Sequence, residues 1–143
     1  MNWKAFNLGL GLCALATVAG YLALQRGPAR PSRPVTVAPE KLGVAKDSEL
    51  PVLVDFYADW CGPCRAEKPI VERASQEWAG RVKFVKLNID EDKGRLAASL
   101  GINAIPSMVL MNPRTKSGFL HTGFLGDDQL REFIKQGLQT VSR

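Results

Sequence analysis

Cysteine and histidine are scarce in this chain, which has three Cys and one His among 143 residues. Three cysteines are too few for a fold held together by several disulfides. A structural zinc site needs four ligands, and Cys61 and Cys64 could be joined only by Cys13 and His121. The sequence therefore predicts no metal site and no bound cofactor, and we expect His121 to have a surface or packing role.

Acidic residues are absent from residues 1–39, although this stretch holds four of the 19 Lys and Arg residues. The net charge of +5 therefore comes almost entirely from the N-terminal extension, and the rest of the chain is close to neutral. The remainder contains no basic stripe with interleaved aromatic residues. Nucleic-acid binding is therefore not expected.

Charge is also missing from residues 8–24, which are mostly Leu, Ala, Gly and Val and are flanked by Lys4 and Arg26. A bilayer-spanning helix needs about 17–25 apolar residues, whereas the apolar part of a cleaved signal peptide has about 7–15. We expect residues 1–24 to form an uncleaved membrane anchor, with a cleaved signal segment as the alternative.

The sequence offers one argument for each side of the membrane as the location of the domain. Three arginines come after the apolar segment and one lysine precedes it, so the positive-inside rule favours a domain inside the cell. However, N-terminal signal anchors commonly export the domain attached to them, and disulfides persist outside the cytosol. We expect an extracytoplasmic domain, on the periplasmic side.

Proline marks the boundary of the folded part. Residues 25–34 contain three Pro and one Gly, which excludes regular structure and favours an extended linker before a domain at 35–143. The predicted strands are 35–37, 52–57, 82–88, 107–111 and 118–124, and the predicted helices are 39–46, 61–78, 92–100 and 127–139. Alternating strands and helices predict a three-layer α/β fold. Its last two strands pair antiparallel across a short turn, so the central sheet is mixed.

The motif Trp60-Cys61-Gly62-Pro63-Cys64 comes directly after a β-branched and aromatic run at 51–57. The run predicts a buried strand, and a CxxC that opens a helix after such a strand is typical of redox chemistry. The free N–H groups at a helix start stabilise a thiolate. We expect an exposed Cys61 to be the nucleophile, and Cys64, one turn further and more buried, to be the resolving thiol. Pro63 pre-forms the first helical turn.

Asp55 is the one charged residue in the predicted strand 52–57. Alternation places it on the same face as Leu53 and Tyr57, beneath the cysteines. Burial there would raise its pKa, whereas a solvated edge carboxylate is the alternative.

Several features occur together in the order that is found in one family. They are the segment 54–65, Pro69 in the long helix, the segment 86–90, Ile105-Pro106 and Gly123. Over about residues 33–141 the chain resembles the thioredoxin family. It departs from the family at Tyr57, where a tryptophan is usual, and in a longer turn at 112–117. The N-terminal anchor resembles that of tethered, exported members.

The resemblance implies roles for individual residues. Asp55 would relay a proton for the resolving thiol, and Lys86 would neighbour it, although a solvated strand lysine is the alternative. Gly62 and Pro63 would set a reducing couple. A cis Ile105–Pro106 bond would leave the Ile105 backbone available to a substrate strand and keep metal ions from the dithiol. The apolar docking rim beside Pro106 would consist of Trp60, Pro63, Ala104, Ile105 and Gly123.

We therefore expect a thiol–disulfide oxidoreductase, most simply a membrane-tethered protein-disulfide reductase that acts by dithiol–disulfide exchange. Its partners would be protein disulfides and an upstream thiol reductant, such as a membrane thiol transporter. The same residues would serve a disulfide oxidase or isomerase. A non-catalytic tethered assembly module is a further hypothesis, and a monomer is expected.

Overall fold

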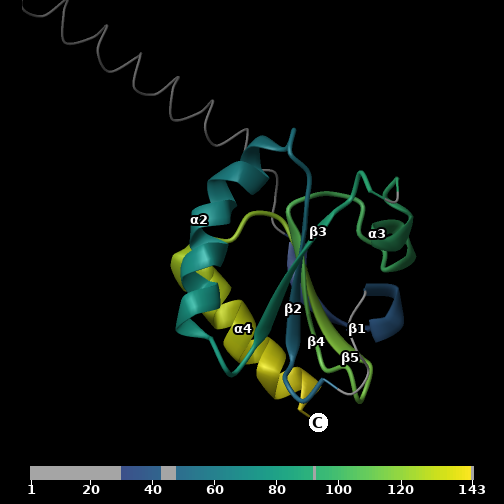
Figure 1. Cartoon of the computed structure of the whole chain (residues 1–143), viewed down its shortest axis with the longest axis vertical. Helices are drawn as coiled ribbons and strands as arrows, with labels where there is room; N and C mark the ends of the chain where they lie inside the picture. Colours follow the sequence, from purple (N-terminus) through teal and green to yellow (C-terminus); the bar gives the residue numbers. More distant parts are fainter. Residues whose placement is uncertain (1–29, 43–47, 92, 143) are drawn as a thin grey trace, which may run out of the picture.

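A five-stranded mixed sheet runs through the middle of the domain (Figure 1). The computed structural model describes residues 30–42, 48–91 and 93–142. The strands are β1 (Arg30–Thr36), β2 (Val52–Tyr57), β3 (Lys83–Asn88), β4 (Ser107–Met111) and β5 (Ser117–Thr122), in the spatial order β1-β5-β4-β2-β3. β2 and β3 pair parallel and the other neighbours pair antiparallel. The predicted mixed sheet is therefore confirmed.

Helices cover both faces of the sheet, as Figure 1 shows. The long helices α2 (Gly62–Glu77) and α4 (Asp127–Val141) lie on one face, and the short 3-10 helix η1 (Pro39–Leu42) and α3 (Arg95–Ser99) lie on the other. Each face has its own apolar cluster, one built with α2 and α4 and the other with η1 and α3. The three-layer α/β architecture is confirmed.

Backbone angles explain why some elements are shorter than expected. Lys93 and Gly94 have φ of 56° and 71°, which a right-handed helix does not contain, so α3 begins at Arg95. Gly123 has φ of 119°, and β5 accordingly ends at Thr122. The predicted helix at 39–46 is a 3-10 turn over its first four residues, and the remainder lies outside the described residues.

β2 alternates as its sequence predicts. Val52, Val54 and Phe56 pack in the cluster with η1 and α3, whereas Leu53 packs with α2 and α4. Asp55 shares the face of Leu53, because successive side chains of a strand point to opposite sides. This alternation turns the Asp55 carboxyl toward the helix that begins with the CxxC motif.

β1 begins at Arg30, inside the stretch that we expected to lack regular structure. It pairs with β5 from Arg30 to Thr36, with an irregular register between Arg30 and Arg33. Proline is tolerated here because β1 is an edge strand, where a missing N–H on the outer side breaks no ladder. The prediction that 25–34 is an extended linker is therefore wrong from Arg30 onward.

The predicted membrane anchor, residues 1–24, lies outside the described residues. Within the part of the chain that the structure describes, no helix has the length and apolar character needed to cross a bilayer.

Candidate active site

The two cysteines of the motif stand at the start of α2. Cys61 is the N-cap of the helix and forms a disulfide with Cys64, with a Cα–Cα separation of 5.3 Å. The Cys64 backbone N–H donates to Cys61 Sγ at 3.2 Å. Pro63 occupies the first turn, where a missing N–H costs no helical hydrogen bond. The site thus holds a dithiol couple at the positive end of a 16-residue helix.

Burial of the pair differs from the sequence prediction. Cys61 is 4% exposed and Cys64 is 7% exposed, so the first cysteine is not the more open residue in the disulfide form. The reason is tertiary, because Tyr57, Ile89 and Ile105 pack around the pair. These side chains come from three separate segments, and the local sequence at the motif does not reveal their contact.

Asp55 is buried beneath this helix start, on β2. The residue is 5% exposed, and burial raises the pKa of its carboxyl group to about 6, against an opposing effect of the Lys86 ammonium. Lys86 is the register partner of Asp55 on β3, and its Nζ lies 4.8 Å from the centre of the Tyr57 ring. The solvated-edge alternative for Asp55 is therefore excluded, and Lys86 is its neighbour as expected.

Glu67 is a buried acidic residue that the sequence prediction missed. It is 1% exposed, and its Oε1 accepts a hydrogen bond from the Leu125 backbone N–H at 2.6 Å. Burial raises its pKa to about 8, the Leu125 hydrogen bond opposes this, and the nearby charge of Asp55 adds to it. The sequence does contain a signal, since Glu67 falls on the apolar stripe of α2 with Cys64, Val71 and Ala74.

A pocket of 340 Å³ opens beside Cys64 and Lys86. Its walls include Arg65 and Lys68, and the Arg65 guanidinium donates to the Asp59 carbonyl oxygen at 2.8 Å. The pocket gives solvent a route to the side of Cys64. Three cationic side chains and the acidic Asp59 line it, so positive charge predominates and favours negative charge near the resolving sulfur.

The residues of the predicted docking rim lie just before α2, in its first turn, and in the loops before β4 and after β5. Trp60 is 65% exposed, which excludes core packing, and its Nε1 donates to Asp90 Oδ2 at 3.0 Å. The Ile105–Pro106 bond is cis, as expected, and the Gly123 N–H donates to the Pro106 carbonyl at 2.9 Å. Pro63 and Ala104 are exposed. The structure thus brings Ile105 against the cysteines, with Gly123 joined to the adjacent proline.

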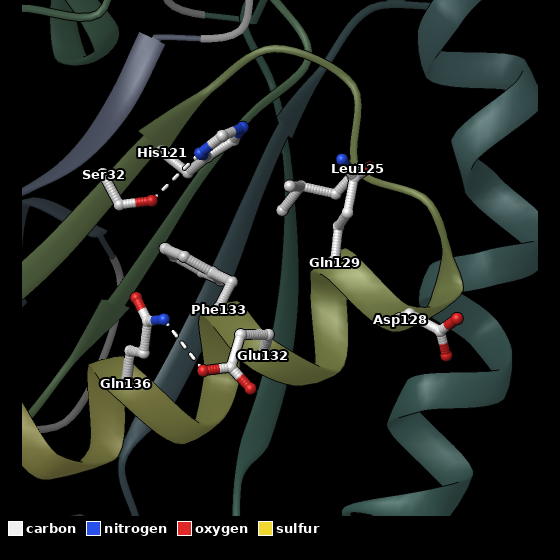
Figure 2. Close-up of a pocket in the computed structure, with 8 residues that line it drawn as sticks. All are labelled: Ser32, His121, Leu125, Asp128, Gln129, Glu132, Phe133 and Gln136. Atoms are coloured by element: carbon white, nitrogen blue, oxygen red, sulfur yellow. Dashed lines mark hydrogen bonds between the residues drawn. The ribbon is translucent and has the colours of Figure 1, made fainter.

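His121 lies apart from this constellation, in a pocket between β5 and α4 (Figure 2). Its Nδ1 is 3.0 Å from Ser32 Oγ, and its ring meets Phe133 edge-on at 5.9 Å between ring centres. Burial lowers its pKa. The packing role is therefore confirmed, and the residues that the structure describes contain no cluster of three or more potential metal-binding side chains.

Comparison with known sequences agrees with this geometry. The model of the thioredoxin family matches residues 40–136. A thioredoxin of Haemophilus influenzae is 38% identical over 96 residues, which cover 65% of this chain and 85% of the relative. A thioredoxin of Synechocystis sp. is 55% identical over 64 residues, which cover 45% of this chain but only 59% of the relative.

Comparison with solved structures gives the same fold. Chloroplastic thioredoxin z is 35% identical, with a TM-score of 0.58 over 70% of this chain and 89% of that chain. A malarial protein with a TM-score of 0.54 is 20% identical, and this likeness concerns the fold alone.

Proposed function

This chain belongs to the thioredoxin family, and we propose that it is a protein-disulfide reductase tethered to a membrane. The observation that supports the thiol–disulfide activity most directly is the Cys61–Cys64 couple at the N-terminus of α2, above the buried Asp55 and beside the cis-Pro106. Each of these groups has a task in dithiol–disulfide exchange. A non-catalytic assembly module would need none of them.

The reaction begins with the reduced couple. The Cys61 thiolate attacks a substrate disulfide, forms a mixed disulfide and expels the first substrate thiolate. Cys64 gives its proton to the Asp55 carboxylate and attacks Cys61 Sγ, which forms the Cys61–Cys64 bond and releases the second substrate thiolate. Two electrons pass to the substrate, and an upstream dithiol protein must return two electrons to the enzyme.

The tether and the location are proposed from the sequence. Residues 8–24 carry no charge, and a span of this length is close to what a bilayer helix needs. On the periplasmic side the reductant would be a membrane thiol transporter, and the substrates would be exported proteins with disulfides. The alternative roles, oxidase or isomerase, use the same residues and differ in the potential and in the direction of electron flow.

The potential of the Cys61–Cys64 couple tests the direction. The full chain with Cys13→Ser is equilibrated with glutathione or dithiothreitol buffers, and the oxidised fraction is measured by thiol labelling. We expect a potential near that of thioredoxin, about −270 mV. A value near about −120 mV, as in a strong disulfide donor, would overturn the reductase proposal and indicate an oxidase.

A trapping variant tests catalysis. In Cys64→Ser the mixed disulfide on Cys61 cannot be resolved, so we expect substrate proteins to accumulate as reducible adducts. Cys61→Ser is the matched control and should form no such adducts. If Cys61→Ser retained full function in cells, the catalytic proposal would fail and a binding role would be indicated.

A further inference from the structure

Glu67 is the most deeply buried charged side chain among the described residues, at 1% exposure. It lies three residues after Cys64 on α2, which places the two side chains next to each other on one helix face. A buried carboxyl group loses its hydration, and this cost calls for an explanation. The exchange mechanism above does not use Glu67.

The hydrogen bond to Leu125 explains the burial of only one of the two carboxyl oxygens of Glu67. Oε1 accepts from the Leu125 N–H at 2.6 Å and so fixes the loop before α4, and Figure 2 shows Leu125 on that loop. Oε2 is buried and has no hydrogen-bond partner among the described residues. A glutamine could hold Leu125 equally well, so the loop contact does not account for a group that can ionise.

Asp55 and Glu67 lie on the facing sides of β2 and α2. Asp55 shares the sheet face of Leu53, which packs with Val71 and Ala74, and Glu67 belongs to the same buried stripe of α2 as these two residues. The negative charge of Asp55 adds to the effect of burial on the pKa of Glu67, because two like charges close together do not both ionise readily. Coupling of this kind is reciprocal, so the proton that remains after the first ionisation belongs to the pair rather than to one residue.

We propose that Glu67 is a positioning residue that acts through Asp55: the two buried carboxyl groups share one proton, and Glu67 thereby controls how readily Asp55 takes the proton of Cys64. This inference rests on the dithiol exchange proposed above. When Glu67 is neutral, Asp55 is a moderate base. When Glu67 is also ionised, its charge makes Asp55 hold a proton more strongly and thus accept it from Cys64 more readily.

Other charged groups around the pair are few. Lys86 faces Asp55 from β3 and favours its ionised form, and Met108 is the partner of Asp55 on β4. On β5 the buried His121 contacts Ser32 and Phe133. The α4 face toward the core is apolar, and Asp127 and Asp128 pair instead at the surface with Arg73 and Arg131.

The first test measures the two carboxyl groups directly. The oxidised full chain is titrated while carbon-13 NMR monitors the side-chain carboxyl carbons, which requires no catalytic activity. We expect the Asp55 curve to have a main step near pH 6 and a second, smaller step near pH 8. Glu67→Gln should remove the second step, and Asp55→Asn should lower the Glu67 midpoint. A single-step Asp55 curve, or an unchanged Glu67 midpoint, would overturn the proposal.

The second test measures the resolving step. The reduced chain with Cys13→Ser is mixed with 5,5′-dithiobis(2-nitrobenzoate); attack by Cys61 releases one coloured thiolate, and attack by Cys64 releases a second. We expect the rate of the second phase in Glu67→Gln to equal that of the protein with Glu67 near pH 7. Above about pH 8 the rate in Glu67→Gln should be lower by about threefold or more. In an Asp55→Asn background, Glu67→Gln should have no further effect.

Matched variants separate proton coupling from structure. Glu72→Gln removes an exposed carboxylate from the same helix and should leave both titrations and rates unchanged. Glu67→Leu also removes the Leu125 contact. If Glu67→Leu slows the second phase equally with Asp55 and with Asp55→Asn, that slowing comes from the lost contact and not from proton coupling. If Glu67→Gln made the second phase faster above about pH 8, or still changed its rate in the Asp55→Asn background, Glu67 would act directly on Cys64 and the proposal would fail. Neither result depends on whether the couple reduces or oxidises its substrates.

Discussion

Asp55 shows at the scale of one residue how a buried carboxyl group reduces stability. Its carboxyl is buried, and its pKa is about 6 in the folded protein against 3.8 for the free side chain. A raised pKa in a carboxyl group means that folding favours the protonated form. The contribution of this pKa shift to the free energy of unfolding is complete below about pH 4 and is lost as the pH rises through about 6.

Asp55→Asn should therefore stabilise the oxidised protein at about pH 8. A shift of about two pKa units corresponds to about 3 kcal/mol, and we expect a gain of up to this size in the free energy of unfolding. The gain should shrink toward zero near pH 4, where aspartic acid is neutral in both states. Urea unfolding at the two pH values measures it. Asp59→Asn, an exposed neighbour, is the control, and an equal gain at both pH values would contradict the buried-charge argument.

Trp60 is the residue of the docking rim with the most exposed apolar surface. Trp60→Ala should change the free energy of unfolding by less than about 0.5 kcal/mol, because surface substitutions usually have small effects. It should lower kcat/KM for a protein disulfide by about tenfold, since exposed aromatic anchors dominate protein contacts. The reaction with a small aromatic disulfide should be unchanged. Equal losses for both substrates would indicate a disturbed thiol site instead.

At the scale of the element, α2 combines two functions on one helix. Its N-terminus supplies the thiol couple, and its buried stripe continues from Cys64 through Glu67 to Val71 and Ala74. The opposite face is exposed, and Arg73 pairs with Asp127 at 2.8 Å across to α4. The apolar stripe holds the helix on the sheet, and this contact places Glu67 within the influence of Asp55.

α4 approaches the sheet closely at Gly137, where a glycine is needed for space. A Cβ added there would lie 2.6 Å from Leu110 Cδ2 and 3.2 Å from Phe119 Cδ1. Overpacking costs about 1–3 kcal/mol, whereas alanine gains about 1 kcal/mol in helix propensity. We expect Gly137→Ala to lower the free energy of unfolding by about 1–2 kcal/mol in urea. Gln139→Ala on the exposed face should have little effect, and a stabilising Gly137→Ala would show that the core yields easily.

At the scale of the whole molecule, the chain combines a redox domain with a charge-free N-terminal segment. If residues 1–24 are an anchor, their deletion should leave the thiol chemistry of the domain intact while releasing it from membranes. We expect the full chain to sediment with membranes after alkaline extraction and the shortened chain to stay in the supernatant. A full chain that is released by alkaline extraction would contradict the anchor.

Orientation is tested on the same full chain in intact cells. An exported domain exposes its reduced thiols to a maleimide that cannot cross the membrane, so we expect Cys61 to be labelled without lysis. Cys61→Ser with Cys64→Ser is the control for background. Labelling that requires lysis would place the domain in the cytosol.

Local signals in the sequence were sufficient for much of the fold and the site. The β2 strand, the helix start at the CxxC motif and the alternation that buries Asp55 are determined by a few neighbouring residues, because strand and helix periods act over short distances. The cis bond before Pro106 was predicted from the family resemblance and is confirmed. The roles of Asp55, Lys86 and the docking rim remain predictions that the experiments above address.

The sequence by itself determined the redox chemistry, since two cysteines at a helix start after a buried strand are a local pattern with one main use. Tertiary structure alone decided the burial of Cys61, the pairing of β1 with β5 despite the prolines in β1, and the position of Glu67 near Asp55. These depend on segments far apart in the chain: Ile105 against the cysteines, β5 beside β1, and Leu125 against α2. Burial of a charged side chain depends on what packs over it, and that contact is made only when the chain has folded.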